Sequence, residues 1–235
     1  MSKGEDGMST RIDHLAIAAS TLEEGVEWAR RALGAVPPAG GVHPRMGTHN
    51  HLMRLGGAPP GGEVYLEIIA VDPQAPPPDR PRWFALDDPA MRDRLRSGPQ
   101  LVTWIARTDS IQEAAVRSPI PLGPVEPMSR GGLEWRITVP PDGALPEGGT
   151  LPALIQWPAD RPHPAGGMAD LGCRLLALDL WHPKPDRLSA ALDAIGLERG
   201  DGLVRIHAAE GEPTLGARLA TPLGTVGIGR TAMEA

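Results

Sequence analysis

Apolar and polar residues alternate along several short stretches of this chain, and helical spacing follows the first of them. In the stretch 12–18, His14 and Ala16 fall on one side of the backbone and their neighbours on the other. This period of two is typical of a β-strand. In the next stretch, 21–34, Thr21 is followed three residues later by a glutamate, and a glycine closes the apolar pattern. A capping box and a terminal glycine predict a helix there.

The order of strand, helix and further strands recurs twice more. The first unit continues with predicted strands at 49–55 and 64–71. The later units are predicted to contain strands at 101–107, 133–139 and 151–157 with a helix at 111–116, then strands at 174–180, 203–208 and 215–220 with a helix at 185–195. Such units bury the inner side of a sheet against one another while their helices cover the outer side.

These units define the expected domain boundaries. Residues 1–10 lack apolar periodicity and are expected to form a disordered leader. The predicted division of the rest is a first unit at 11–72, a second at 100–158 and a third at 173–235, with Pro-rich linkers at 73–99 and 159–172.

Composition narrows the class of protein. The chain has 235 residues, a net charge of −6 and scattered basic residues, so nucleic acid is not expected as a partner. Cys173 is the single cysteine, and no apolar run is long enough to span a membrane. We therefore expect a soluble protein of a bacterial cytoplasm, a monomer or homodimer, whose partner is a small molecule.

Two ionisable residues on predicted strands are the main candidates for chemistry. His14 stands on the first strand and Glu67 about fifty residues later on another, so a sheet can bring imidazole and carboxylate together. Such a pair suits a divalent metal (Fe, Mn, Ni or Zn) or a proton-transfer couple. A carboxylate among apolar neighbours also needs a partner, which could be a metal, His14, an arginine or backbone amides. Alternatively, His14 is a core histidine bonded to a backbone carbonyl.

Several strings carry a family resemblance: Asp13-His14, Gly41-x-His43, Gly47-Thr48-x-Asn50-x-Leu52, Tyr65-Leu66-Glu67, Leu133-Glu134-Trp135, Ile155-Gln156-Trp157 and His163-Pro164. Their order resembles that of the vicinal oxygen chelate superfamily, and more narrowly of the bacterial glyoxalase-like domain proteins. The resemblance implies an α+β fold in which tandem βαβββ modules form a cupped mixed sheet with helices outside. It also implies metal ligands on the first and last strands of a module, where His14 and Glu67 stand.

The second module departs from that pattern. Its corresponding strands read Thr103-Trp104-Ile105 and Ile155-Gln156-Trp157, so a second His and Glu are missing. Glyoxalase I activity is therefore not expected, and a lyase, isomerase or dioxygenase-like reaction takes its place. His51 could supply a third metal ligand if its side chain faces inward, and Gln156 is a weaker oxygen donor.

Further residues are candidates for binding a substrate. His43 and Asn50 could orient it, since an amide both donates and accepts hydrogen bonds. The other candidates are Thr48 beside them, Arg130 for a carboxylate, Gln156 for an oxygen, and Trp104 and Trp157 for an apolar ring. Each has a plain alternative as a solvated loop residue, a surface arginine or a core tryptophan.

Two functions follow from these residues. One is a glyoxalase-like enzyme acting on a small oxygen-bearing organic molecule, in which a metal chelates adjacent oxygens or Glu67 takes a proton without metal. The other is a protein that binds and sequesters a hydrophobic small molecule or antibiotic without changing it. The missing second-module ligands and the many tryptophans favour the latter.

Overall fold

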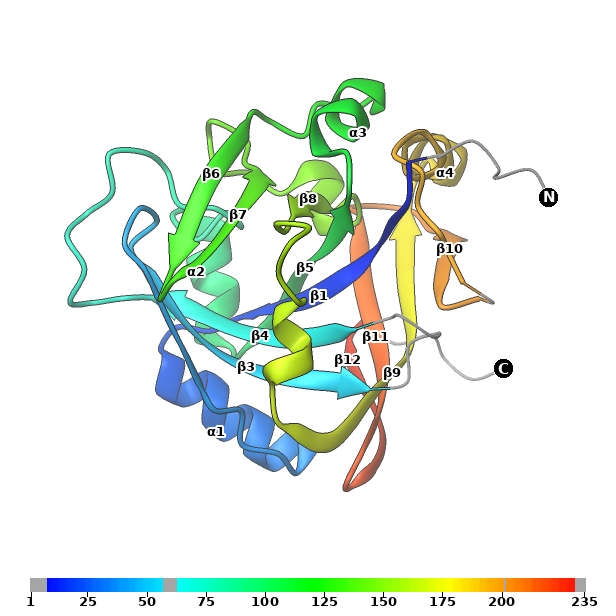
Figure 1. The fold of residues 1–235 in the computed structure, drawn as a ribbon. Coiled ribbons are helices and arrows are strands. Elements are labelled where there is room, and N and C mark those ends of the chain that lie inside the picture. Colours follow the sequence, from blue (N-terminus) through cyan, green and yellow to red (C-terminus); the bar gives the residue numbers. More distant parts are fainter. Residues whose placement is uncertain (1–7, 57–62, 201, 231–235) are drawn as a thin grey trace.

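A computed structural model describes residues 8–56, 63–200 and 202–230 of the chain (Figure 1). Its first unit comprises β1 (Thr10–Ala18), α1 (Leu22–Leu33), β2 (Ala39–His43), β3 (Thr48–Gly56) and β4 (Val64–Val71). The second comprises β5 (Gln100–Thr108), α3 (Ile111–Arg117), β6 (Val125–Arg130), β7 (Leu133–Thr138) and β8 (Ala153–Gln156). The third comprises β9 (Asp170–His182), α4 (Pro185–Ala194), β10 (Val204–Ala208), β11 (Thr214–Thr221) and β12 (Gly224–Gly229).

Shorter elements connect the units. Helix α2 (Pro89–Arg96) precedes the second unit, and the 3-10 turn η1 (Pro146–Gly149) lies within it between β7 and β8. The 3-10 turn η2 (Pro164–Gly167) precedes the third unit. In Figure 1 the segment after β8 crosses in front of the sheet before β9 begins. No helix among the described residues is long and apolar enough to cross a membrane.

All described strands belong to one curved sheet of mixed direction. Its order is β12-β11-β9-β3-β4-β1-β5-β8-β7-β6, with β2 paired to β3 and β10 paired to β9. Strand β1 is parallel to β4 and antiparallel to β5, and this second pairing joins the first two units. The α+β fold with a mixed, curved sheet is therefore confirmed.

The predicted signals at the ends of α1 are present in the structure. The backbone N–H of Glu24 donates to Thr21 Oγ1 over 3.2 Å, which caps the first turn. Gly34 ends the helix with a φ of 66°, the left-handed conformation that glycine adopts without a steric penalty. Helix α1 then buries Leu22, Ala29 and Leu33 against the sheet.

The two sides of the sheet carry separate hydrophobic clusters. On the side that α1 covers, here called the helix side, Leu15, Ile17 and Trp104 pack together. On the opposite side, here called the cup side, Ala16 and Ile105 pack with residues of the second unit. Since successive side chains of a strand point to opposite sides, the register of β1 decides which residues reach the cup.

Some elements were not predicted from the sequence: β2, β6, β12, α2, η1 and η2. Helix α2 lies within 73–99, where a linker was expected, and Asp88 caps it by accepting from the Ala90 N–H. The expected leader, 1–10, lies mostly outside the described residues, but Thr10 opens β1 and is buried.

Candidate functional site

The two main candidates meet on the cup side of the sheet. His14 on β1 and Glu67 on the adjacent parallel strand β4 are 5% and 6% exposed. The distance from His14 Nε2 to Glu67 Oε2 is 3.5 Å. The structure therefore brings together the imidazole and the carboxylate that the strand pattern paired.

Asp13 joins them through an irregularity in β1. The pairing of β1 with β5 shifts between Ile12 and His14, so Asp13 is the extra residue of a bulge. Simple alternation would send Asp13 and His14 to opposite sides of the sheet. Instead, His14 Nδ1–H donates to Asp13 Oδ1 over 2.6 Å.

The second oxygen of Asp13 has two further donors. Trp157 Nε1–H lies 2.9 Å from Asp13 Oδ2, and His163 Nε2–H lies 2.8 Å from the same oxygen. Burial alone would raise the pKa of Asp13, but the hydrogen bonds from His14 and His163 outweigh it and hold that pKa well below its usual range. Asp13 is thus a buried carboxylate that stays ionised.

The same contacts determine the charge of His14 and Glu67. Burial lowers the pKa of His14, but hydrogen bonds to Asp13 and Glu67 outweigh it and raise the pKa to about 9. Burial raises the pKa of Glu67, but contacts with His14 and His43 and a hydrogen bond from Asn50 lower it to about 2. At neutral pH the site therefore holds an imidazolium between two carboxylates.

His43 has the opposite ionisation. Burial lowers the pKa of His43 to about 4, so its ring is neutral at pH 7. Its Nδ1–H donates to Thr48 Oγ1 over 3.1 Å, while its Nε2 faces Arg130 Nη1 at 3.4 Å. Titratable groups whose surroundings push their pKa values apart are typical of acid–base sites.

Asn50 orients Glu67 from β3. Its Nδ2–H donates to Glu67 Oε1 over 2.5 Å, and its Oδ1 accepts from the Gly41 N–H over 3.0 Å. A side chain at Gly40 would place its Cβ 2.2 Å from Asn50 Oδ1. Glycine in β2 is therefore required by the close approach of the Asn50 amide.

A small cavity lies over these groups. Its volume is about 20 Å³, room for about one water molecule. The residues that line it are His14, His43, Tyr65, Glu67, Trp83, Phe84, Arg130, Trp135, Ile137, Ile155 and Trp157. Tyr65 stacks on His14 with ring centres 4.3 Å apart.

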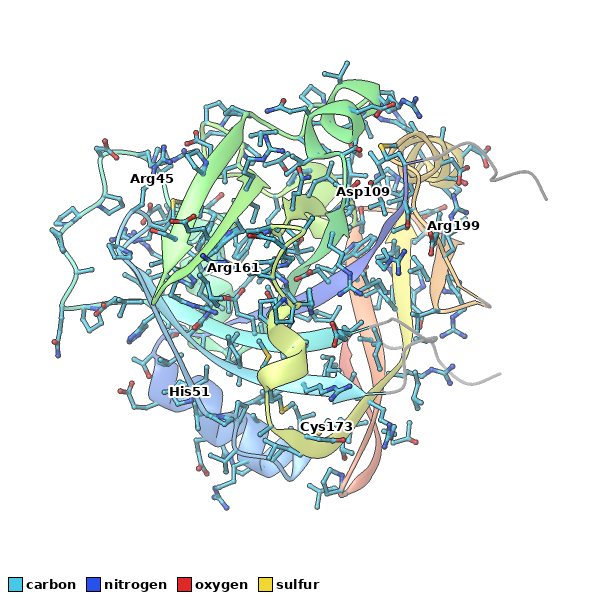
Figure 2. The ribbon with its side chains drawn as sticks, in the orientation of Figure 1. Arg45, His51, Asp109, Arg161, Cys173 and Arg199 are labelled. Atoms are coloured by element: carbon cyan, nitrogen blue, oxygen red, sulfur yellow. The ribbon has the colours of Figure 1, made fainter. Side chains whose placement is uncertain are left out.

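A larger cavity of about 720 Å³ lies next to the small one. Trp135 and Trp157 line both, so these two rings form the partition between them. Arg45, labelled in Figure 2, lies in the lining of the larger cavity. The small cavity has no room for a substrate of several atoms, so side chains of its lining would have to move for one to reach His14 and Glu67.

Three predicted residues lie elsewhere. His51 pairs with Ile68 and so lies on the helix side, where its Nδ1–H donates to the Pro37 carbonyl over 2.6 Å (Figure 2). Trp104 is also on the helix side, with its indole N–H bonded to the Thr150 carbonyl. Gln156 lines the larger cavity and accepts from Arg136. His51 and Trp104 therefore do not belong to the expected site. Each stands one strand position away from a residue that faces the cup side, so its side chain points to the helix side.

Of the remaining predicted residues, His43, Arg130 and Trp157 line the small cavity. Thr48 and Asn50 stand behind it, where they hold His43 and Glu67.

Part of the donor set fits a divalent metal. His14 Nε2 and Glu67 Oε2 are close enough to share an ion, and a histidine whose other nitrogen is bonded to a carboxylate is usual at metal centres. Within the described part of the chain, however, no three His, Cys, Asp or Glu side chains are grouped so that they could hold a metal. The expected set of His14, Glu67 and His51 is not assembled.

Comparison with known proteins agrees with the fold. The chain belongs to the glyoxalase-like domain family, whose model matches residues 12–196, and this confirms the resemblance noted in the sequence. Among solved structures, a hypothetical protein from Staphylococcus aureus is similar over 86% of this chain and 87% of its own, with a TM-score of 0.59 and 14% identity.

Two Streptomyces coelicolor enzymes are also similar. A methylmalonyl-CoA epimerase variant in complex with 2-nitronate-propionyl-CoA has 22% identity and a TM-score of 0.42 over 63% of this chain and 98% of its own. A mutant of 4-hydroxymandelate synthase has 14% identity and a TM-score of 0.48 over 94% of this chain and 62% of its own. No curated protein matches the sequence.

Proposed function

We propose that this protein is an enzyme that moves a proton at a carbon next to a carbonyl or carboxyl group of a small organic molecule. Glu67 is the base and His14 the acid. The observation that carries the proposal is the contact of 3.5 Å between His14 Nε2 and Glu67 Oε2, both of which line the small cavity. It uses only groups that the structure brings together, whereas a metal-assisted route would require a third ligand.

The ionisation of the pair suits this role. With a pKa of about 2, Glu67 is ionised and able to accept a proton, but its contact with His14 makes it a weak base. A substrate oxygen that accepts the Nε2–H of His14 would take the place of Glu67 in that contact. The carboxylate would then become more basic at the moment the substrate is in position.

The proton balance of the step is simple. The C–H proton passes to Glu67 Oε2, and the negative charge moves to the substrate oxygen, where the His14 imidazolium stabilises it. Return of the proton from Glu67 to the carbon restores both groups. Asp13 fixes the ring of His14 through Nδ1, and Asn50 occupies Oε1 of Glu67, so that Oε2 remains for the transfer.

The walls of the cavity also support a second function, that of a protein which binds an apolar molecule without changing it. Trp83, Phe84, Trp135 and Trp157 surround the charged groups. Aromatic walls of this kind bury much apolar surface of a ligand.

Hydrogen exchange separates the two functions. Small ketones, 2-oxo acids and 2-hydroxy ketones would be incubated with the protein in D₂O, and proton NMR would follow loss of the C–H signal. We expect exchange of at least one compound, reduced about a hundredfold or more in Glu67→Gln. Glu113→Gln, an exposed carboxylate on α3, is the matched control and should not change the rate.

A rate of exchange in Glu67→Gln equal to that of the wild type would contradict the role of Glu67 as base. Binding without exchange in either protein would favour the sequestering function instead.

A further inference from the structure

We infer that the substrate carries a carboxylate and that Arg130 on β6 binds it. The inference rests on the proposed function, since it concerns the same cavity. Arg130 is the one arginine or lysine among the described residues lining that cavity. It faces His14 and Glu67 from the second unit, so a bound carboxylate would place the adjacent carbon between the two units.

Arg130 has no acidic partner among the described residues. Its hydrogen-bond partner in the described part of the chain is the neutral ring of His43, at 3.4 Å, and no carboxylate there lies within 4.0 Å of its guanidinium. Nearby arginines differ, because Arg45 and Arg80 both pair with Glu126. A half-buried guanidinium without a carboxylate partner among the described residues, beside a small cavity, is suited to a carboxylate, which it can bind through two parallel hydrogen bonds.

The position of Arg130 is shaped by β2. A Cβ at Gly41 would lie 2.9 Å from Arg130 Cδ and 3.0 Å from Cγ. Any side chain at Gly41 would therefore push the aliphatic part of Arg130 away. On its other side the guanidinium lies over the ring of Trp135, 5.9 Å from its centre. Gly41 and Trp135 thus hold the guanidinium in place without neutralising it.

The rest of the cavity limits the remainder of the substrate. Apart from Arg130 and the polar groups His14, His43 and Glu67, its walls are aromatic or aliphatic. Trp83 has a buried indole N–H with no partner among the described residues. The structure therefore assigns a class of substrate: a small organic acid with an apolar remainder and an ionised carboxylate.

Binding by matched probes tests the inference independently of turnover. Propionate and phenylacetate would each be titrated beside the corresponding neutral amide, with affinity measured by NMR. We expect the wild type to bind at least one carboxylate about tenfold or more tightly than its amide. Arg130→Gln should lose this preference, Arg130→Lys should keep part of it, and Gly41→Ala should weaken carboxylate binding severalfold.

Arg136→Gln is the matched control, because Arg136 lines the larger cavity and should not affect the preference. No preference for carboxylates in the wild type, an unchanged preference in Arg130→Gln, or an equal loss in Arg136→Gln would overturn the inference. Glu67→Gln should still bind the carboxylate, so failure of the base role and failure of the Arg130 role give different results.

Discussion

The first two units share one order of strands but place different side chains on the cup side. On β1 and β4 of the first unit the cup side carries His14 and Glu67. On β5 and β8 of the second unit it carries Thr103, Ile105 and Ile155, all buried. The ionisable pair therefore belongs to one unit, while the other supplies apolar walls and Arg130.

This difference reflects the cost of burying charge. A carboxylate removed from water is tolerated only where hydrogen bonds replace its hydration. The first unit provides these through the bulge at Asp13, the amide of Asn50 and the ring of His14. The inner strands of the second unit, β5 and β8, instead bury uncharged side chains on the cup side, which avoids this cost. One unit thus holds the reactive groups, and the other shapes the space over them.

The largest effect should come from removing the central charge of the first unit. Asp13→Asn leaves the His14 imidazolium with one carboxylate and disturbs the contacts to Trp157 and His163. We expect the free energy of unfolding to fall by about 3 to 5 kcal/mol, as for other broken buried ion pairs. Urea denaturation at pH 7 measures it.

Glu134→Gln provides the comparison from the second unit. Glu134 is exposed, so its loss should change the free energy of unfolding by no more than about 0.5 kcal/mol. Equal effects of the two substitutions would show that the charge of Asp13 does not support the site.

A smaller effect is expected from pH. The pKa of His14 rises from 6.5 in the unfolded chain to about 9 in the folded protein, so the folded state binds more protons between these values. Stability from His14 is therefore complete below pH 6.5 and is lost as the pH rises through 9, a change on the order of 3 kcal/mol. Urea denaturation at pH 6.5 and pH 9 should show this fall in the wild type.

The fall should be absent in His14→Gln. It should persist in His43→Gln, because the pKa of His43 is lowered to about 4 and its ring is neutral in both states above pH 6.5. The same fall in His14→Gln as in the wild type would contradict the charge assigned to His14.

The sequence predicted the parts of the site that depend on regular spacing. Period-2 alternation in β1 and the apolar run of β4 were enough to place His14 and Glu67 on strands that a sheet can bring together, and local capping was enough to define α1. Both depend on neighbours in the chain, and both are visible in single stretches of sequence.

Other parts of the site depend on strand irregularities and on contacts between distant parts of the chain, which no single stretch of sequence reveals. A bulge adds one residue and changes the side to which Asp13 points, and alternation cannot indicate it. His163 reaches Asp13 from 150 positions away in the chain. Strand β2 is short and rich in glycine, so its sequence has little strand propensity. Its glycines allow the backbone to approach Asn50 and Arg130 closely.

The smallest predicted effect concerns the hydrogen bond from Trp157, in the second unit, to Asp13 in the first. Trp157 Nε1–H donates to Asp13, whereas the indole of Trp135, on the other half of the partition, makes no hydrogen bond among the described residues. Trp157→Phe and Trp135→Phe remove similar ring volumes. Urea denaturation should show that Trp157→Phe costs about 1.5 kcal/mol more, the contribution of a hydrogen bond to a charged group.

Equal losses in the two variants would mean that the partition stabilises the protein by packing alone. If the predicted difference is found, a ligand that moves Trp157 aside also removes a donor from the carboxylate that orients His14. Opening of the cavity and the ionisation of the site would then be linked through Asp13, and the division of roles between the two units would not be complete.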